Sequence, residues 1–481
     1  MKISDYAECD ATGLAQLIAA REVSAAEVQR AARAAIEQVN PALNALVGDL
    51  FDEPLACDAD GPFRGVPFAI KDLAIHAEGV PTRLGSRLTG RGIPFPYDTE
   101  LMARFRRAGL AVLGRTATPE FGFNASTESV ANGPTRNPWD VARTPGGSSG
   151  GSAALVAARA LPAAHASDGG GSIRIPAGWC GLVGLKPTRG RTAPGPDFDE
   201  MLGGLAIEFA VTRTVRDAAA LLDAVHGAGV GDKYEIRPPG RPYVEEVGAP
   251  PGRLRVAVTA RSWSGSAVDP EHAQAVLVVG RELASLGHVV EEASPSVDWE
   301  PFVKAQLAIW TCFLASGALG LSAALGVPLG PEVLEATTLA CVEYSQRLTA
   351  LDLHAAHHVC NTIRRAVAGF FQRHDVLITP TVAAPPPPLG TLDANDASLG
   401  AEGWIDKLFD TIPFTPLFNL TGQPAISLPL AETSAGLPIG VQLVGRYGAE
   451  DTLFRLAAQL EQALPWRARR PEAVIARHAG D

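Results

Sequence analysis

GGSSGGSAALVAARALPAAHASDGGGSIRIPAGWCGLVGLKP, from Gly146 to Pro187, carries two serines set among glycines, Ser148 and Ser172. Between them, the alanine-rich run 152–160 predicts a helix, and the short apolar run 161–166 predicts a strand. Glycine permits positive φ angles and close approach of the backbone. Three glycines directly before Ser172 can therefore direct successive backbone N–H groups at one point, which is the arrangement that stabilises an oxyanion.

The spacing of the two serines resembles the signature of the amidase signature family. That signature is a Gly-Gly-Ser-Ser-Gly-Gly element followed by Asp-x-Gly-Gly-Ser-Ile-Arg-x-Pro, with the two key serines 24 residues apart, as Ser148 and Ser172 are (172 − 148 = 24). Further family motifs stand in the same order along most of the chain, at Gly65–Asp72, Thr135–Trp139, Cys180–Thr188 and Gly422–Pro429. The pattern is closest to bacterial amidases of the 6-aminohexanoate cyclic-dimer hydrolase type.

The resemblance implies a Ser–cis-Ser–Lys triad of Ser172 as nucleophile, Ser148 as proton relay after a cis Gly147–Ser148 bond, and Lys71 as base. It also implies an acyl-enzyme mechanism that needs no cofactor and no metal. The oxyanion hole is expected from the backbone N–H groups of Gly169, Gly170, Gly171 and Ser172. Supporting side chains are expected from Ser149, Asp168 and Arg174.

The resemblance also implies the fold, an α/β/α sandwich around a large twisted mixed β-sheet. Alternating helical and strand patterns agree with an α/β class. We expect an N-terminal helical region over 1–64, the signature core over 65–230, and the remainder of the same core over 231–480. Within that remainder, residues 300–372 are mostly helical in pattern and are predicted to form a peripheral cap over the site.

The implied reaction is hydrolysis of a carboxylic amide, with aryl amides, cyclic or linear oligoamides and carbamates (a urethanase activity) as candidate substrates. A second possibility is the glutaminase subunit of a tRNA-dependent amidotransferase, which shares the signature. The expected partner is a small amide or carbamate, and the expected oligomeric state is a monomer or homodimer.

Several residues are candidates on more local grounds. Lys71 follows the apolar run Val66 to Ile70, so burial and a lowered pKa are expected, and a neutral lysine can act as a base. Phe123 and Asn124 lie where the family has its acyl-pocket loop, and Trp310 is a candidate pocket wall. Gly169 stands where many relatives have a larger residue, which predicts a roomier acyl site.

The same residues allow other interpretations. Ser148 also fits the G-x-S-x-G nucleophile elbow of α/β-hydrolase esterases, but the preceding segment with Pro145 is a poor strand. A glycine-rich turn can bind phosphate, yet no GxxxxGK[ST] is present. His165 would offer a Ser–His pair. His354, His357 and His358 have helical spacing, for which a solvated helix face is favoured over a metal site.

Composition sets wider limits. The 481 residues include 46% hydrophobic residues and carry a formal net charge of −11, which argues against nucleic-acid binding. The six cysteines form no CxxC pair and are predicted to be buried thiols of a reducing compartment. No signal-peptide pattern is present at the N-terminus, so a cytoplasmic location is expected. The uncharged stretch 305–331 contains glycines and prolines and is predicted to be a buried helical pair rather than a membrane span.

Patterns elsewhere predict individual elements. An amphipathic helical region is expected over 11–40, with Ser24 as an N-cap and Pro41 as a stop. Further helices are expected over 100–108 and 270–286, and a surface linker over 227–252. Strands are expected at 65–70, 110–114, 254–259, 375–380, 426–430 and 439–444.

Overall fold

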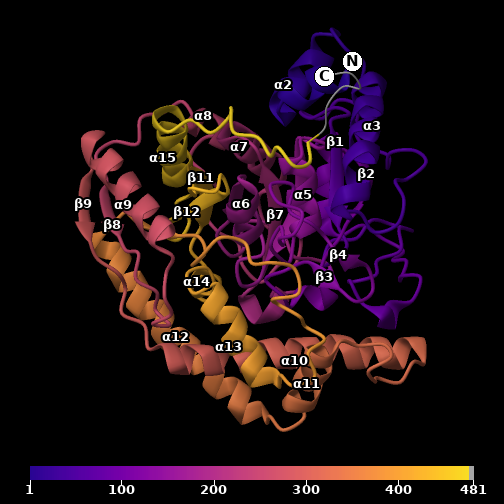
Figure 1. Ribbon diagram of the computed structural model, residues 1–481, viewed down its shortest axis with the longest axis vertical. Coiled ribbons are helices and arrows are strands. Elements are labelled where there is room, and N and C mark those ends of the chain that lie inside the picture. The colour runs from indigo at the N-terminus through magenta and orange to yellow at the C-terminus, as the bar shows by residue number, and fades with distance from the viewer. Residues whose placement is uncertain (476–481) are drawn as a thin grey trace.

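A mixed eight-stranded sheet forms the centre of the protein in the computed structural model, which describes residues 1–475 (Figure 1). β8 pairs in parallel with β9 and β10, and the other neighbouring strands are antiparallel. The predicted sandwich around a large mixed sheet is therefore confirmed. In spatial order the strands are β5 (Ala163–Asp168), β7 (Ile207–Thr212), β6 (Val183–Lys186), β11 (Ala425–Glu432), β12 (Pro438–Gly445), β10 (Val376–Pro380), β8 (Arg255–Val258) and β9 (Val289–Glu292).

A parallel pair, β1 (Pro67–Lys71) and β2 (Ala111–Thr116), lies beside β5 at one end of the large sheet. Every residue of both strands is buried, as the apolar sequence of the first predicted. The strand expected at 65–70 is thus confirmed, and it ends at Lys71. A small hairpin, β3 (Glu128–Ser129) with β4 (Gly133–Pro134), lies in the loop that precedes the signature.

The N-terminal region contains α1 (Ile3–Glu8), α2 (Ala11–Ala19) and α3 (Ala25–Leu43). Ser24 is the N-cap of α3 and forms a capping box with Glu27, as predicted. The prediction that Pro41 stops this helix is wrong, because α3 continues to Leu43. A proline so near the end of the helix removes only one backbone hydrogen bond. The helix is terminated by its C-cap residue Asn44, which has a left-handed backbone conformation.

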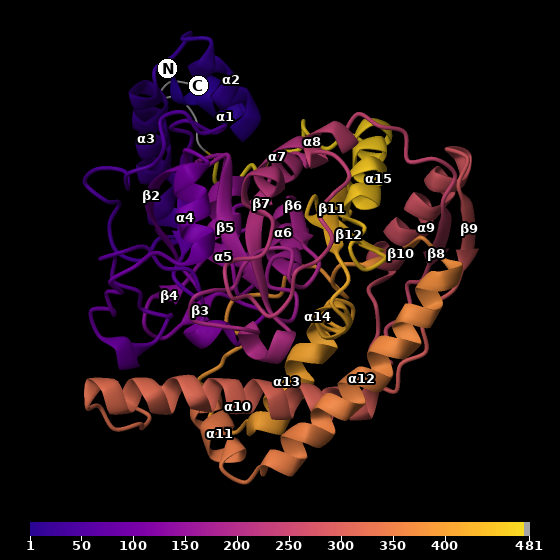
Figure 2. The same cartoon turned by 180° about the vertical axis from the view of Figure 1, so that it is seen from behind.

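Helices cover the sheet and are predominantly apolar where they contact it (Figures 1 and 2). The helix predicted from the alanine-rich run is α5, and all of its residues are buried. These helices are α4 (Glu100–Arg107), α5 (Gly150–Ala157), α6 (Arg174–Cys180), α7 (Val215–Val225), α9 (Pro270–Ser285), α14 (Pro416–Thr421) and α15 (Glu450–Ala463). Short elements are the helix α8 (Tyr243–Glu246) and the 3-10 turns η1 (Arg87–Thr89), η2 (Glu120–Gly122) and η3 (Met201–Gly204).

Four further helices form a layer along one side of the molecule, seen at the bottom of Figure 1: α10 (Trp299–Leu325), α11 (Ala336–Ser345), α12 (Ala350–Arg373) and α13 (Ala401–Thr411). The predicted helical cap is present, but the helical pair expected within 305–331 is one helix of 27 residues. Its internal glycines do not interrupt it, and Pro328 and Pro331 lie beyond its left-handed C-cap, Gly326.

α10 is the one helix among residues 1–475 that is long and apolar enough to span a membrane by length and composition. Its N-terminal half is packed in the protein, in a hydrophobic cluster shared with α12 and α13. The six cysteines are free thiols, as predicted. Only Cys180, Cys341 and Cys360 are buried, so the prediction that all six are buried is wrong.

Candidate active site

Lys71 is the most deeply enclosed member of the candidate site. It ends β1 and is fully buried. Its Nζ donates to Ser148 Oγ at 2.6 Å and to Ser167 Oγ at 2.9 Å. Burial lowers the pKa of Lys71 to about 7, against the charges of Glu208 and Asp168, which raise it. A large fraction of this amine is therefore neutral near neutral pH and can accept a proton from a hydroxyl.

Ser148 lies in the loop before α5, after a cis Gly147–Ser148 peptide bond, which confirms the predicted geometry. Gly147 has no room for a side chain, because a Cβ there would lie 2.5 Å from the backbone oxygens of Asn124 and Ser126. No strand directly precedes Ser148 in the described chain. The strand–turn–helix context of the α/β-hydrolase elbow is therefore missing, and that alternative is set aside.

Ser149 ties this loop to β5. Its Oγ donates to the backbone oxygen of Ser167 at 3.2 Å and accepts from the N–H of Ser167 at 3.3 Å. Ser149 itself is fully buried. These two bonds fix the loop that carries Ser148 against the strand that carries Ser167, and both serines contact Lys71.

Ser172 lies in the loop that joins β5 to α6, and with Ser148 it lines one cavity. Gly171 in this loop has φ 133°, and a Cβ there would lie 2.3 Å from Thr415 Oγ1. The hydroxyl of Thr415 donates to the backbone oxygen of Gly170 at 2.7 Å. The loop is thus held from outside by α14 and its N-cap residue Thr415.

The predicted oxyanion donors differ in availability. The N–H of Gly171 donates to Asp168 Oδ1 at 2.8 Å, so this group is already used, contrary to prediction. For the N–H groups of Gly169, Gly170 and Ser172, residues 1–475 provide no hydrogen-bond acceptor. These three N–H groups remain as candidates for an oxyanion hole.

Asp168 and Arg174 form a fully buried ion pair beneath this loop, with two contacts of 2.9 Å. Burial raises the pKa of Asp168, but the charge of Arg174 and the surrounding hydrogen-bond donors outweigh this effect and hold the pKa at about 2. Asn419 donates to Asp168 Oδ1 at 2.8 Å and accepts from Arg174 at 2.6 Å. The pair supports the loop and does not line the cavity, which is the arrangement expected of supporting residues.

His165 and Glu208 lie behind Lys71. The backbone N–H of Lys71 donates to His165 Nδ1 at 3.3 Å, so in the neutral ring the proton is on Nε2. Nε2 lies 3.1 Å from Glu208 Oε1, and burial lowers the pKa of His165. His165 does not line the cavity, and its ring nitrogens lie next to Lys71 and Glu208, so it does not form a Ser–His pair.

We predict that Glu208→Gln lowers the pKa of Lys71. The carboxylate of Glu208 favours the protonated lysine, as does that of Asp168, while protonation of His165 would disfavour it. Lys71 is expected to act as a base in its neutral form, so the acid limb of the kcat/KM profile is expected to move to lower pH. The measurement is kcat/KM against pH for a chromogenic amide.

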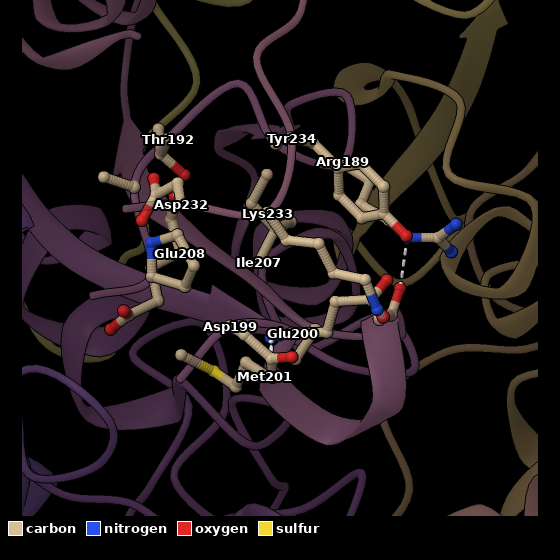
Figure 3. A pocket seen from close by; sticks show the side chains of 15 residues that line it. Arg189, Thr192, Asp199, Glu200, Met201, Ile207, Glu208, Asp232, Lys233 and Tyr234 are labelled. Atoms are coloured by element: carbon tan, nitrogen blue, oxygen red, sulfur yellow. Dashed lines mark hydrogen bonds and ion pairs between the residues drawn. The ribbon is translucent and has the colours of Figure 1, made fainter. Parts of the chain in front are cut away.

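Glu200→Gln is the matched control for this experiment. Glu200 pairs with Lys233 at 2.5 Å, and in Figure 3 this pair lies across a small pocket from Glu208. This control removes an equal charge from a residue that does not act on Lys71. We expect it to leave the pH profile of kcat/KM unchanged. A uniform loss of kcat in Glu208→Gln with an unmoved acid limb would contradict an electrostatic role.

The cavity above the serines has a volume of about 370 Å³ and walls that are mainly apolar. Trp310 is one of its walls, as predicted, on a face of α10 that also presents Phe313, Leu314, Gly317 and Leu321. Phe123 and Asn124 are not among the lining residues. Phe123 stacks behind Trp310, with ring centroids 4.7 Å apart, and Asn124 donates to the backbone oxygen of Leu392.

Trp310 also changes the expectation for Gly169. A Cβ on Gly169 would lie 2.9 Å from Leu202 and 3.1 Å from the indole of Trp310. The space that a larger residue would occupy is therefore filled from α10 and η3. The prediction of a roomier acyl site at this position is wrong, because distant side chains take up that volume.

Among the polar residues of the site that were not predicted, three contact Lys71 or the glycine loop directly. Ser167 contacts Lys71 directly, and Thr415 and Asn419 hold the glycine loop. Alternation along β5 could have identified Ser167, since His165 and Ser167 share one face of that strand. Thr415 and Asn419 come from a segment almost 250 residues away in sequence, and no local signal links them to the signature.

The histidine cluster on α12 does not form a metal site. His354 and His358 are exposed and His357 is half-buried. Within the described part of the chain, no group of three or more His, Cys, Asp or Glu residues could hold a metal ion.

Comparison with protein families gives a match to the family described as Amidase over residues 27–454. Among characterised sequences, the 6-aminohexanoate-cyclic-dimer hydrolase of Paenarthrobacter ureafaciens is 41% identical over 479 residues, which cover 96% of each chain.

Solved structures give the same relationship. Two structures of 6-aminohexanoate cyclic dimer hydrolase, one complexed with substrate, match with a TM-score of 0.92 at 39% and 38% identity, covering 97% of this chain and 99% of theirs. A glutamyl-tRNA(Gln) amidotransferase chain of Thermotoga maritima matches with a TM-score of 0.74 at 26% identity, covering 99% of this chain and 98% of that one.

Proposed function

Because this chain belongs to the amidase signature family, we propose that it hydrolyses carboxylic amides through an acyl-enzyme on Ser172, with Ser148 and Lys71 as the proton relay. The observation that carries the proposal is the 2.6 Å contact between Lys71 Nζ and Ser148 Oγ. Lys71 is fully buried, and Ser148 lines the same cavity as Ser172. A buried amine with a pKa near neutrality is suited to general-base catalysis.

In the acylation step, Ser172 Oγ attacks the amide carbonyl carbon. Its proton passes to Ser148, whose own proton passes to the neutral Nζ of Lys71. The carbonyl oxygen becomes an oxyanion, for which the unpartnered N–H groups of Gly169, Gly170 and Ser172 are the proposed donors. The C–N bond then breaks, and the amine leaves with a proton returned from Lys71 through Ser148.

Deacylation repeats the relay with water as the nucleophile. Lys71, neutral again, accepts the water proton through Ser148. The ester bond to Ser172 then breaks, the acid product leaves, and the proton returns from Lys71 through Ser148 to Ser172 Oγ. Each half-reaction returns the proton that it takes, so Lys71, Ser148 and Ser172 end the cycle in their starting protonation states. The proposed chemistry needs no cofactor.

For the substrate, we propose small apolar amides, including linear and cyclic oligoamides, aryl amides and aryl carbamates. The apolar walls and the volume of about 370 Å³ support this class, because pockets of this size enclose most of a small ligand. The likeness to a 6-aminohexanoate-cyclic-dimer hydrolase over 96% of both chains supports the oligoamides among them. The glutaminase subunit is the second candidate, supported by the shared fold.

A substrate panel tests the proposal: p-nitroanilides, linear and cyclic amides, aryl carbamates and free glutamine, each ranked by kcat/KM. We expect hydrolysis of apolar anilides or oligoamides and no ammonia release from glutamine. Glutamine as the best substrate would favour the amidotransferase function instead. The absence of hydrolysis across the whole panel would contradict the proposed amidase activity.

A further inference from the structure

One carboxylate, partly exposed to solvent, stands among the mainly apolar side chains that line the active-site cavity. Asp197 lines the cavity, in the loop that leads from β6 to η3. It follows a cis Gly195–Pro196 bond and precedes Phe198, whose ring lies 5.9 Å from that of Phe313 on α10. The neighbouring lining side chains are mainly apolar, and they include Leu73, Leu84, Phe95, Phe121, Leu314 and Leu321.

The contacts of Asp197 leave its charge without a permanent counterion. Tyr97 OH donates to Oδ1 at 2.7 Å, and His76 Nε2 lies 3.5 Å from Oδ2. Across residues 1–475, no lysine or arginine forms an ion pair with this carboxylate. Its two polar neighbours are therefore a phenol and an imidazole.

His76 is itself a lining residue, and one of its two ring nitrogens, Nε2, lacks a hydrogen-bond partner within the described residues. The residue is 3% exposed, and its ring stacks on Phe95 with centroids 3.8 Å apart. Burial lowers the pKa of His76, although Asp197, Glu208 and Asp98 raise it. A neutral imidazole does not balance the carboxylate near neutral pH.

We propose that Asp197, together with His76, forms a subsite for a positively charged amine, so that the preferred substrates are amides whose apolar arm ends in an ammonium group. The inference rests on the proposed amidase function and specifies its substrate class. An ammonium group beside Asp197 would pair with the carboxylate, while the methylene arm would lie along the apolar walls. A hydrogen bond between two charged groups is about twice as strong as a neutral one.

The first experiment compares substrates that differ only in this charge: the p-nitroanilides of ω-aminohexanoic acid and of hexanoic acid, with shorter and longer homologues. At pH 8 the amines are charged, because their pKa resembles that of lysine. We expect kcat/KM to favour the charged twin by about tenfold or more at the best length, as charged hydrogen bonds allow. N-(aminohexyl)benzamide against N-hexylbenzamide makes the same comparison with the amine on the leaving arm.

The variant that tests the residue is Asp197→Asn, which removes the charge and keeps an acceptor for Tyr97. We expect the charged-over-neutral ratio of kcat/KM to fall toward one. Asp199→Asn is the matched control, since Asp199 lines the small neighbouring pocket and not the cavity (Figure 3). It removes an equal charge two residues away and is expected to preserve the ratio. Asp197→Ser serves as a second variant, with thermal unfolding measured for each.

A binding measurement separates this inference from the proposed reaction. Calorimetry of n-hexylammonium and 1-hexanol is expected to show tighter binding of the cation to the wild type, and a loss of that preference in Asp197→Asn. If neither anilide twin is hydrolysed but the cation preference is present, the amidase proposal fails and the subsite stands. The subsite would be overturned by a charged-over-neutral ratio of kcat/KM near one for both the anilide pair and the benzamide pair. Equal binding of the cation and the alcohol would also overturn it.

Discussion

Ser172→Ala is expected to remove amide hydrolysis, by a factor on the order of 10⁴ or more in kcat, because members of a catalytic triad act as one unit. The substitution removes the atom that would form the acyl-enzyme. The Asp168–Arg174 pair and Thr415 hold the surrounding loop through backbone and side-chain groups that alanine does not disturb. The measurement is kcat on the best substrate of the panel, with thermal unfolding to verify that the fold is retained.

Covalent labelling identifies the nucleophile independently. A sulfonyl fluoride is expected to modify Ser172, which peptide mass mapping would locate. Ser148 is the informative comparison, because it lines the same cavity and contacts Lys71. Labelling of Ser148 with Ser172 unmodified would show that our mechanism assigns the nucleophile to the wrong serine.

Lys71→Met is the second large effect, expected to reduce kcat by on the order of 10³ or more. Methionine fills much of the volume of the buried lysine stem but cannot accept a proton. Lys71→Arg is expected to fail almost as completely, because a guanidinium stays charged at any useful pH. Both variants are measured at saturating substrate, so that the loss is assigned to the chemical step.

The pH profile of the wild type tests the same group. Burial lowers the pKa of Lys71 to about 7, and the proposed relay uses its deprotonated form. Therefore kcat/KM should rise as the pH passes through about 7 and reach a plateau above it. Near wild-type activity in Lys71→Arg would exclude the lysine relay. His165 would then be mutated next, although it does not line the cavity.

Much of the candidate site was predictable because its residues lie in short local motifs. The two glycine-flanked serines and the lysine at the end of an apolar strand lie in short motifs whose backbone requirements dictate their residues. Gly147 shows why, since any side chain there would collide with the backbone at 2.5 Å. The same holds for Ser24 as a helix N-cap, where one side chain and its neighbour three residues later suffice.

Two predictions about the glycine loop were wrong, one because of a contact within the loop and one because a distant segment packs against it. Gly171 has the predicted position, but its N–H is taken by Asp168, which depends on how the loop turns after β5. The space at Gly169 is filled by Trp310 from α10, a helix more than 100 residues later in the chain. Which neighbour occupies a gap is a matter of packing, and periodicity alone does not specify it.

Short motifs were enough to predict the family, the positions of Ser148 and Ser172 and the strand that ends at Lys71, because each depends on residues close together in the chain and on backbone geometry that few residue types allow. The folded structure was needed to identify the walls of the cavity, the groups around Lys71 at Ser167 and Glu208, and the position of Asp197 among apolar side chains. These features come from strands and helices that are remote in sequence, and their energies depend on burial and distance. We therefore expect substrate choice to depend on the cavity walls and Asp197, which are brought together only by folding.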